Sequence, residues 1–370
     1  MTVHTTSNAP ADLTNIPKKH KAAVYDKPGT LSIKMVEVDT PEPGQGEVLV
    51  RLTHSGVCHS DYSVMMNAWK ALPAPTPAGQ VGGHEGVGFV AKLGPGLENS
   101  PVQVGDRVGI KWLSAVCNSC VPCLSGRDSS CTAGKISGYY TPGTFQQYAT
   151  APASYVTPIP AELDSAAAAP QLCAGVTVYA AMQKADVKAG QFVVIMGAGG
   201  GLGHLACALA SKGFGARVIG IDHGSKRAIA EDNGVEFFID FTETKDVTAE
   251  IMKITGGLGA HSVLVVTASN AAYAQSLTFL RFGGIVVCIG VPEGDLAPVG
   301  TASPALLIFK ELRLVGSAVG GRLQAIETLD FAARGVLKTH YKTAKLEDIA
   351  QVFQDMEDGK IQGRVVVEID

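Results

Sequence analysis

The chain has 370 residues, of which 46% are hydrophobic and 17% charged, a composition that excludes a disordered protein and at this length favours two domains. The formal net charge of -4 argues against nucleic acid or an anionic membrane as a partner. The sequence has neither an apolar run of about 18 residues nor a secretory signal pattern, so a cytoplasmic protein with no membrane partner is predicted.

The first part of the chain has the pattern of a β-rich domain. Polar residues 1–20 are predicted to form a flexible N-terminal extension. Pro-Gly turns then separate short strand-like runs at residues 22–25, 31–38, 48–54, 87–93 and 107–110. This succession, with little helix, predicts antiparallel strands.

After about Thr177 the pattern changes to a regular alternation of strands and helices. The strand candidates are residues 192–196, 217–222, 236–239, 262–266 and 285–289, and the helix candidates between them are residues 202–212, 226–233, 247–255 and 271–282. Such alternation predicts a doubly wound parallel sheet. A helix at 323–334 and a strand at 364–369 follow, and we expect them to rejoin the first domain.

A glycine-rich turn follows the first strand of this second part. It predicts backbone contacts to a dinucleotide from Gly197, Gly199, Gly200, Gly201, Leu202 and Gly203. The spacing is one residue longer than the strict fingerprint, so a generic strand-to-helix turn is the alternative.

Asp222 ends the next strand, nineteen residues after Gly203. A carboxylate at this position accepts the ribose hydroxyls and repels a 2′-phosphate, which favours NAD over NADP. Lys226 and Arg227 leave NADP open, because a basic pair could welcome that phosphate. Lys226 and Val291 complete the predicted cofactor contacts.

Four cysteines lie within fifteen residues, at Cys117, Cys120, Cys123 and Cys131. Their loop has little apolar material with which to order itself, and a tetrahedral zinc site would supply that order. Disulfides or a redox dithiol are the alternatives, and the spacings disfavour an iron–sulfur cluster.

Cys58 follows the strand-like run 47–53, and the hydroxyl of Ser60 lies two residues on. Together with His84 and Cys173 it would provide two sulfurs and one nitrogen, the donor set of a catalytic zinc with an open fourth position. A single cysteine is often a core residue, and these three residues lie too far apart for spacing to decide.

The chain resembles the zinc-containing medium-chain alcohol dehydrogenases, most closely the NAD-dependent type of yeasts and filamentous fungi. The resemblance runs from about residue 21 to the C-terminus. Besides the glycine-rich turn, it rests on Gly-Val-Cys-His-Ser-Asp at 56–61, Val-Gly-Gly-His-Glu-Gly at 81–86, Gly-Ile-Lys-Trp-Leu at 109–113, Thr-Phe-Gln-Gln-Tyr-Ala at 144–149 and Leu-Cys-Ala-Gly-Val-Thr-Val-Tyr at 172–179. It implies a GroES-like catalytic domain of residues 21–176 and 317–370 and a Rossmann domain of residues 177–316.

The resemblance also implies two zinc ions per subunit. The catalytic ion would be held by Cys58, His84 and Cys173, with Glu85 behind it as an alternate ligand. The structural ion would be held by the four clustered cysteines. Asp61 would orient His84, a role that a carboxylate hydrogen-bonded to a metal-binding histidine commonly has.

The remaining site residues are implied by the resemblance in the same way. Ser60 would hydrogen-bond the alcohol, and Thr177 would pack on the nicotinamide. His59 and Arg364 would contact the pyrophosphate. Trp69 and Trp112 would line the substrate pocket, with plain core packing as the alternative.

Ser63 departs from the family pattern, because the yeast-type enzymes have a histidine there that relays the alcohol proton toward solvent. A serine hydroxyl does not titrate near neutrality, so it can pass a proton but not store one. Slower alcohol oxidation near neutral pH, or a reductase with another proton route, is the expected consequence.

The predicted function is therefore the interconversion of an alcohol and its aldehyde or ketone by a zinc-dependent, NAD(H)-linked oxidoreductase, active as a homotetramer or homodimer. One alternative is a biosynthetic reductase of the same family that uses NADPH on a conjugated C=C bond or a bulky aldehyde. Another is a nucleotide-binding sensor or structural protein that has lost the chemistry.

Overall fold

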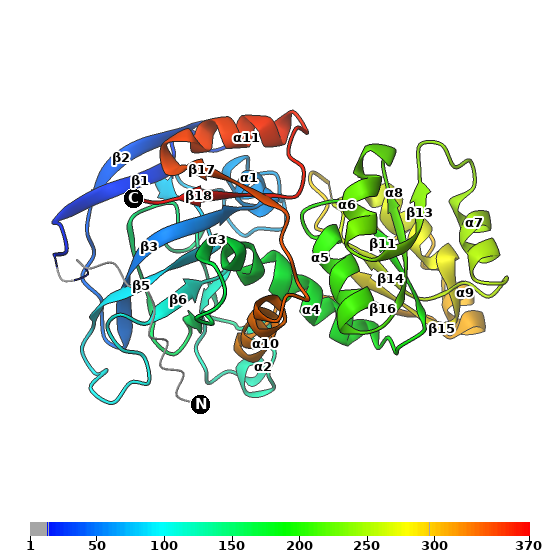
Figure 1. The fold of residues 1–370 in the computed structure, drawn as a ribbon, viewed down its shortest axis with the longest axis horizontal. Helices are drawn as coiled ribbons and strands as arrows, with labels where there is room; N and C mark the ends of the chain where they lie inside the picture. The colour runs from blue at the N-terminus through cyan, green and yellow to red at the C-terminus, as the bar shows by residue number, and fades with distance from the viewer. Residues whose placement is uncertain (1–12, 14, 296) are drawn as a thin grey trace.

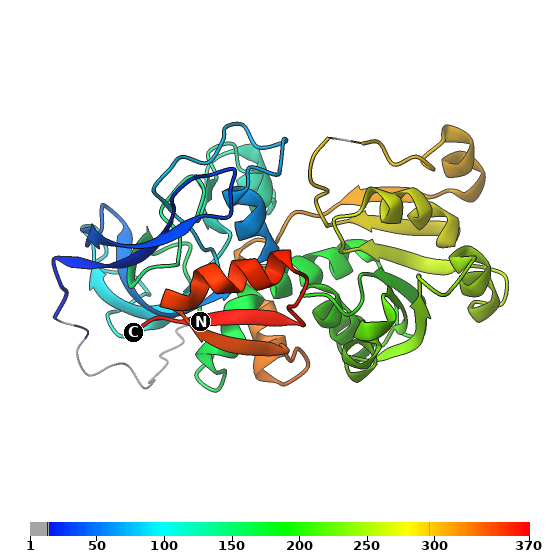
Figure 2. The same ribbon diagram turned by 90° about the horizontal axis from the view of Figure 1, so that it is seen from above.

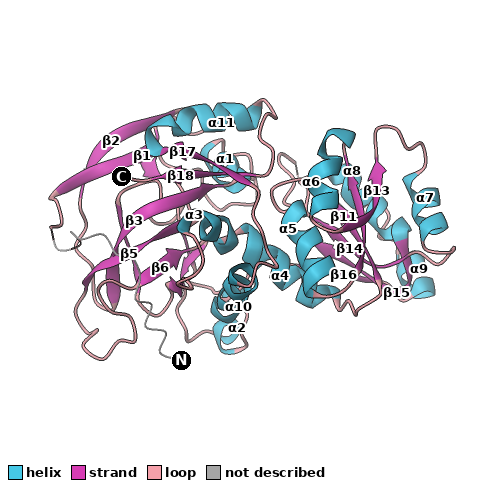
Figure 3. Ribbon diagram, in the orientation of Figure 1, coloured by secondary structure: helices cyan, strands magenta, loops and turns pink. Residues whose placement is uncertain are grey.

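The computed structural model describes residues 13, 15–295 and 297–370, which form two lobes (Figure 1). One lobe is mostly strand, and the other alternates strands with helices, as the colouring by secondary structure makes plain (Figure 3). Within the described residues, no helix is both long and apolar enough to cross a membrane.

The strand-rich lobe contains a seven-stranded, a three-stranded and a two-stranded sheet. The seven-stranded sheet has the order β10-β6-β5-β3-β18-β17, and β9 also pairs with β3. Its strands are β3 (Glu47–Val57), β5 (Gly86–Leu93), β6 (Arg107–Ile110), β9 (Tyr148–Pro152), β10 (Thr157–Pro158), β17 (Tyr341–Lys345) and β18 (Arg364–Glu368). The smaller sheets are β2-β1-β4 and β7-β8, with β1 (Lys19–Tyr25), β2 (Ile33–Asp39), β4 (Gln80–Val81), β7 (Leu113–Ala115) and β8 (Lys135–Ile136).

Strand β3 lies between β5 and β18 in the larger sheet, and its alternate side chains are apolar. Val48, Val50 and Leu52 point to one side, have at most 1% of their surface exposed, and pack in one core with Val90 and Phe145. At its far end β3 delivers the chain to Cys58, where the first candidate site begins.

The strand β18 returns to this sheet from the far end of the sequence. It pairs antiparallel with β3, and the register places Val365 opposite Val57. Seen from above, β18 and α11 (Ile349–Glu357) run beside the N-terminal strands (Figure 2). This register brings Arg364 next to Cys58. The α11 helix and β17 had no counterpart among the predicted elements.

The predicted flexible extension of residues 1–20 is wrong at its C-terminal end. Residues 1–12 and 14 lie outside the described part of the chain, but β1 begins at Lys19. Leu13 is 8% exposed and packs with Leu49 and Phe89, and Ile16 lies against the same cluster. Two apolar side chains in a polar stretch are enough to dock it on β3 and β5.

The second lobe is built on a six-stranded parallel sheet with the order β13-β12-β11-β14-β15-β16. Its strands are β11 (Phe192–Met196), β12 (Arg217–Asp222), β13 (Val235–Asp240), β14 (Ala260–Val265), β15 (Leu280–Cys288) and β16 (Arg313–Gly316). Strand order reverses between β11 and β14, which is the position where doubly wound sheets bind ligands. The predicted doubly wound sheet is confirmed.

Helices on both faces of this sheet include α5 (Gly203–Ala208), α6 (Arg227–Asp232), α7 (Val247–Ile254), α8 (Asn270–Ser276) and α9 (Pro304–Lys310). The predicted helix 271–282 is too long, because β15 already begins at Leu280. Leu277, Phe279 and Leu280 are buried, and so short an apolar pattern could not separate helix from strand. Strand β15 lies one position in from the edge, which β16 occupies.

The remaining helices are α1 (His59–Met65), α2 (Val121–Leu124), α3 (Ser165–Ala168), α4 (Ala174–Ala185) and α10 (Arg322–Ala333). Helix α4 runs between the two lobes and contacts α5 and α10 (Figure 1). The predicted boundary at residues 176 and 177 falls inside α4, so the domain limits stay predictions.

Candidate active site and zinc-binding sites

Cys58 occupies the junction between β3 and α1, where it is the N-cap residue of the helix. Its extended backbone (φ −115°, ψ 151°) turns the chain from strand to helix, and its N–H donates to Asp61 Oδ2 at 2.9 Å. The aspartate at the third helical position therefore caps the helix and fixes the loop that carries the thiol.

Side chains from three distant segments meet at this junction. One donor atom each from Cys58, His84, Glu85 and Cys173 lie within 4.8 Å of one another, and all four residues are buried. His84 and Glu85 come from the turn between β4 and β5, and Cys173 immediately precedes α4. The structure thus brings together the predicted catalytic ligands and the predicted alternate ligand.

His84 has the environment of a metal ligand. Its Nδ1 lies 2.7 Å from Asp61 Oδ1, and its Nε2 is buried without a hydrogen-bond partner in the described part of the chain. With the proton on Nδ1, the lone pair of Nε2 is directed at the cysteines, which suits zinc. Burial alone would lower the pKa of His84, but the charge of Asp61 and its hydrogen bond outweigh burial and raise the pKa well above its ordinary value. A metal at Nε2 would displace the proton that this raised pKa favours there.

The two thiols have pKa values shifted in opposite directions. The hydrogen bond from Cys173 and the nearby charge of Arg364 hold the pKa of Cys58 well below its ordinary value. The hydrogen bond to Cys58 and burial raise the pKa of Cys173. Thiolate is the form of cysteine that binds a metal, so the lowered pKa favours the ligating form of Cys58.

Glu85 and Arg364 form a buried ion pair behind this set. The guanidinium of Arg364 contacts Glu85 Oε1, and its Nη1 lies 3.8 Å from Cys58 Sγ. Burial raises the pKa of Glu85 to about 7, and its Oε2 has no hydrogen-bond partner among the described residues. A Cβ at Gly56 would lie 1.8 Å from that oxygen, so glycine is required where the carboxylate lies.

A cleft of about 590 Å³ opens from this site along the parallel-sheet lobe. Sixteen of the predicted site residues line it: Cys58, His59, Ser60, Trp69, Trp112, Cys173, Thr177, Gly197, Gly200, Gly201, Leu202, Gly203, Asp222, Lys226, Val291 and Arg364. The predicted residues His84, Glu85, Asp61, Ser63 and Gly199 lie behind its surface. Their roles in catalysis or binding remain predictions.

The glycine-rich turn at one end of the cleft is held by Asp222. The N–H of Gly199 donates to Asp222 Oδ2 at 2.8 Å, and the N–H of His223 donates to Oδ1 at 2.8 Å. A Cβ at Gly203 would lie 1.8 Å from Gly197 O, so the chain can turn this sharply only with glycine there. Asp222 thus organises the turn and also lines the cleft.

Trp69 and Trp112 form an aromatic wall at the other end. Their ring centroids are 6.0 Å apart in an edge-to-face arrangement, and Trp112 lies 4.8 Å from the His84 ring. Both are partly buried against the core of the strand-rich lobe and both line the cleft, so the two predicted alternatives, pocket and core, apply together.

Ser63 is fully buried on α1, and its partner was not anticipated from the sequence. Its Oγ donates to Glu293 Oε1 at 2.7 Å, and the same oxygen lies 3.1 Å from His59 Nε2. Glu293 lies in the connection between β15 and α9, where no sequence signal distinguished it from other acidic surface residues.

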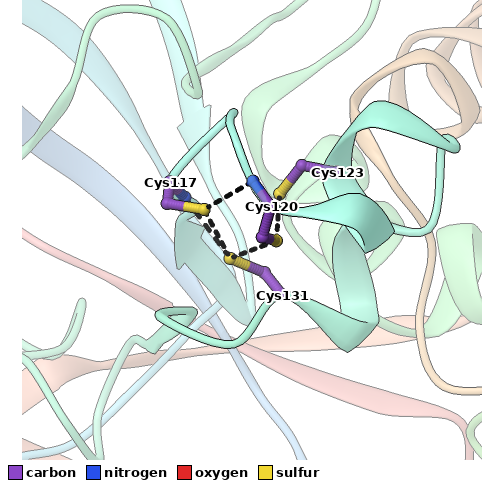
Figure 4. A group of neighbouring side chains, drawn as sticks. All are labelled: Cys117, Cys120, Cys123 and Cys131. Carbon is purple, nitrogen blue, oxygen red and sulfur yellow. Dashed lines mark hydrogen bonds between the residues drawn. The ribbon is translucent and has the colours of Figure 1, made fainter.

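The four clustered cysteines form a separate donor set on the strand-rich lobe (Figure 4). Successive sulfurs lie 3.5 Å (Cys120 to Cys123), 3.9 Å (Cys120 to Cys131) and 3.6 Å (Cys131 to Cys117) apart. A tetrahedron of sulfurs around zinc has edges of about 3.8 Å, whereas a disulfide is about 2.05 Å long. All eight cysteines lie in the described chain and are free thiols, which excludes the disulfide alternative in this structure.

A strand-rich lobe carrying two zinc donor sets, joined to a dinucleotide-type parallel sheet, defines the class of zinc-containing medium-chain dehydrogenases. Comparisons with known proteins agree. The model of the alcohol dehydrogenase GroES-like domain matches residues 44–161, and that of the zinc-binding dehydrogenase domain matches residues 201–334.

Individual relatives extend the match over nearly the whole chain. Alcohol dehydrogenase 2 of Emericella nidulans is 57% identical over 361 residues, which are 96% of this chain and 98% of that protein. The alcohol dehydrogenase of Schizosaccharomyces pombe is 39% identical over 356 residues, 96% of this chain and 99% of that protein. The acetophenone reductase of Geotrichum candidum, solved in complex with NAD, has a TM-score of 0.83 at 28% identity, covering 96% of this chain and 98% of that one.

The chain therefore belongs to the zinc-binding alcohol dehydrogenase family. The family resemblance and the predicted fold class, a GroES-like domain with a Rossmann domain, are confirmed.

Proposed function

We propose that the protein is a zinc-dependent alcohol dehydrogenase that interconverts an alcohol and its aldehyde or ketone with NAD(H). One observation carries the proposal: the donor set of Cys58, His84 and Cys173 lies at the wall of the same cleft as the glycine-rich turn and Asp222. A metal site and a dinucleotide site that share one cleft can bring a substrate oxygen and a hydride acceptor together.

When bound, zinc would act as a Lewis acid on the substrate oxygen, and NAD would accept the hydride. The chain's own residues hold and orient these groups. Cys58, His84 and Cys173 supply the three ligands, and Asp61 keeps the His84 proton on Nδ1. The Ser60 hydroxyl, which lines the cleft two residues after Cys58, hydrogen-bonds the substrate oxygen and takes its proton onward.

The cofactor is proposed to be NAD(H), because Asp222 lines the cleft with both carboxylate oxygens fixed by backbone N–H groups. An anchored carboxylate would repel a 2′-phosphate. His59, Thr177, Val291 and Arg364, all of them in the cleft wall, are the further proposed cofactor contacts. The aromatic wall of Trp69 and Trp112 bounds the proposed substrate pocket.

We also propose a homodimer or homotetramer in the cytoplasm. The support is a set of exposed apolar side chains at the outer edge of the parallel sheet. Phe309 and Ile308 on α9 are 85% and 70% exposed, and Leu314 on the edge strand β16 is 39% exposed. Sedimentation velocity would measure the assembly.

The alternative within the family is a reductase that uses NADPH on a conjugated C=C bond or a bulky aldehyde. Lys226 favours it, because its side chain lines the cleft near Asp222, where it could meet a 2′-phosphate. The experiment that separates the two is a set of initial rates with NAD, NADP and their reduced forms against primary alcohols and enals.

We expect turnover of primary alcohols with NAD and a ratio of rates, NAD to NADP, well above one. Preferred use of NADPH with enals would support the alternative. A protein that binds about one zinc per chain and turns over no substrate would instead be the nucleotide-binding sensor.

A further inference from the structure

Glu293 joins the two lobes through a single carboxylate oxygen. It belongs to the loop that follows β15 in the parallel-sheet lobe, whereas its partners lie on α1 of the strand-rich lobe. Its Oε1 accepts a hydrogen bond from Ser63 Oγ at 2.7 Å and lies 3.1 Å from His59 Nε2.

This contact is well placed to resist separation of the lobes. Ser63 is fully buried, and the Glu293 side chain is 35% exposed, so water competes only in part for the hydrogen bond. Hydrogen bonds to an ionised group are stronger than those between neutral groups. His59 is held from its other side by Tyr62, whose ring stacks on it at 5.2 Å.

Other contacts of the same loop are weaker or do not involve a side chain. The N–H of Gly294 donates to Ala68 O at 3.0 Å, and Gly294 forms a parallel bridge with Trp69. Lys70 and Asp295 pair with 61% and 90% of their side chains exposed, a geometry that contributes little. Glu293 is therefore the side chain on which the contact depends.

The contact spans one end of the cleft. Val291, two residues before Glu293, lines the cleft from one lobe, and His59 and Trp69 line it from the other. Movement that widens the cleft at this end pulls Glu293 away from Ser63. Release of a long ligand from between the lobes needs such a movement.

We propose that Glu293 is a positioning residue that fastens the parallel-sheet lobe to α1 and slows the exchange of the dinucleotide. The inference rests on the proposed function, because it takes NAD(H) as the occupant of the cleft. It also gives a role to Ser63, the residue that departs from the family pattern, because its hydroxyl donates the hydrogen bond to Glu293.

The test is the dissociation rate of NADH in the absence of any alcohol, followed by nucleotide fluorescence in a stopped-flow instrument. Glu293→Ala should raise the rate about tenfold, as expected for loss of a charged hydrogen bond. Ser63→Ala should raise it less, and the double variant should be no faster than Glu293→Ala, because both remove the same contact. Glu293→Gln keeps an acceptor for Ser63 and should recover part of the slow release.

Asp295→Ala is the matched control, since it removes a carboxylate of the same loop whose partner is exposed. Its dissociation rate should stay at the wild-type value. Circular dichroism and zinc content identify the variants that fold. If Glu293→Ala does not fold, the two single variants Glu293→Gln and Ser63→Ala still test the contact.

Wild-type-like release from Glu293→Ala, or a lower melting temperature with an unchanged rate, would overturn the inference. So would strictly additive effects of the two single variants. Failure of the wild-type protein to bind NADH at all would count against the proposed function instead.

Discussion

The two donor sets for zinc differ in how the chain assembles them. The four-cysteine set comes from fifteen consecutive residues, has three half-buried cysteines and offers sulfur alone. The set of Cys58, His84 and Cys173 comes from three segments spread over 115 residues of sequence, is buried, and mixes sulfur and nitrogen. The first set can form locally, whereas the second exists only when β3, the turn before β5 and the start of α4 have packed together.

This difference predicts separate roles for the two sites, one in the stability of the fold and the other in catalysis. Four cysteine ligands complete the tetrahedral coordination of a zinc ion and leave no position for a substrate. The other set has three strong ligands, an ion-paired carboxylate behind them and a cleft in front. Losing the first should therefore loosen the fold, and losing the second should stop the reaction.

The largest effect is expected from Cys58→Ala or Cys173→Ala. Loss of a metal worth several kcal/mol to the transition state should lower kcat/KM by about a thousandfold or more. Zinc analysis should show the loss of about one ion per chain, while the far-ultraviolet circular dichroism stays that of the wild type. Normal turnover in a variant without that zinc would refute the mechanism.

Cys120→Ser tests the other side of the comparison. We expect loss of the other zinc ion and a fall in the free energy of unfolding on the order of 4 kcal/mol, because the metal orders the loop. Denaturant titration measures the fall, and the specific activity of the molecules that remain folded should change far less than in Cys58→Ala. If Cys120→Ser and Cys58→Ala lost activity and stability to the same extent, the two sites would not have separate roles.

Asp61→Asn should have a smaller effect that is confined to the buried site. An amide cannot both accept from Cys58 N–H and His84 Nδ1 as the carboxylate does, so zinc affinity should fall about 10- to 100-fold. Competition with a chelator, followed over time, measures the affinity. The four-cysteine ion serves as the internal reference, since Asp61 has no contact with it.

Ser63→His is expected to have the smallest effect. An imidazole could store the proton that a hydroxyl only passes on, so alcohol oxidation near pH 7 should rise, by about tenfold or less. The gain should fade at alkaline pH, where proton loss to water is easy. Ser63→Ala is the comparison variant, because it loses the same contact with Glu293 without adding a base. A pH profile of kcat for Ser63→His with the shape of the Ser63→Ala profile would disprove a relay role for this position.

Local patterns predicted the elements that depend on neighbouring residues. The strands at Arg107–Ile110, Phe192–Met196 and Arg217–Asp222 have their predicted bounds, because short strand-like runs bounded by turn signals mark their ends in the local sequence. The docked segment around Leu13 and the end of α8 were mispredicted, since each is decided by what packs against it.

The candidate site divides in the same way. The cysteine cluster followed from spacing alone, but the meeting of Cys58, His84 and Cys173 followed only from family resemblance. Neither spacing nor family resemblance pointed to Glu293, because its role depends on Ser63, which lies 230 residues away in the other lobe. Contacts between lobes are set by how two finished surfaces meet, and sequence patterns carry little of that information.

The position of β18 has a consequence for the order in which the protein can fold during synthesis. Residues 364–368 leave the ribosome after the whole six-stranded sheet has been made, yet they complete the sheet in which β3 was made first. Until then residues 54–57 of β3 lack their partner strand, and Arg364 is missing from beside Cys58. The dinucleotide lobe should therefore be finished before the lobe that encloses it in the sequence. Nascent chains stalled before residue 364 should have a folded parallel sheet but lack the ion pair between Arg364 and Glu85 behind the metal ligands.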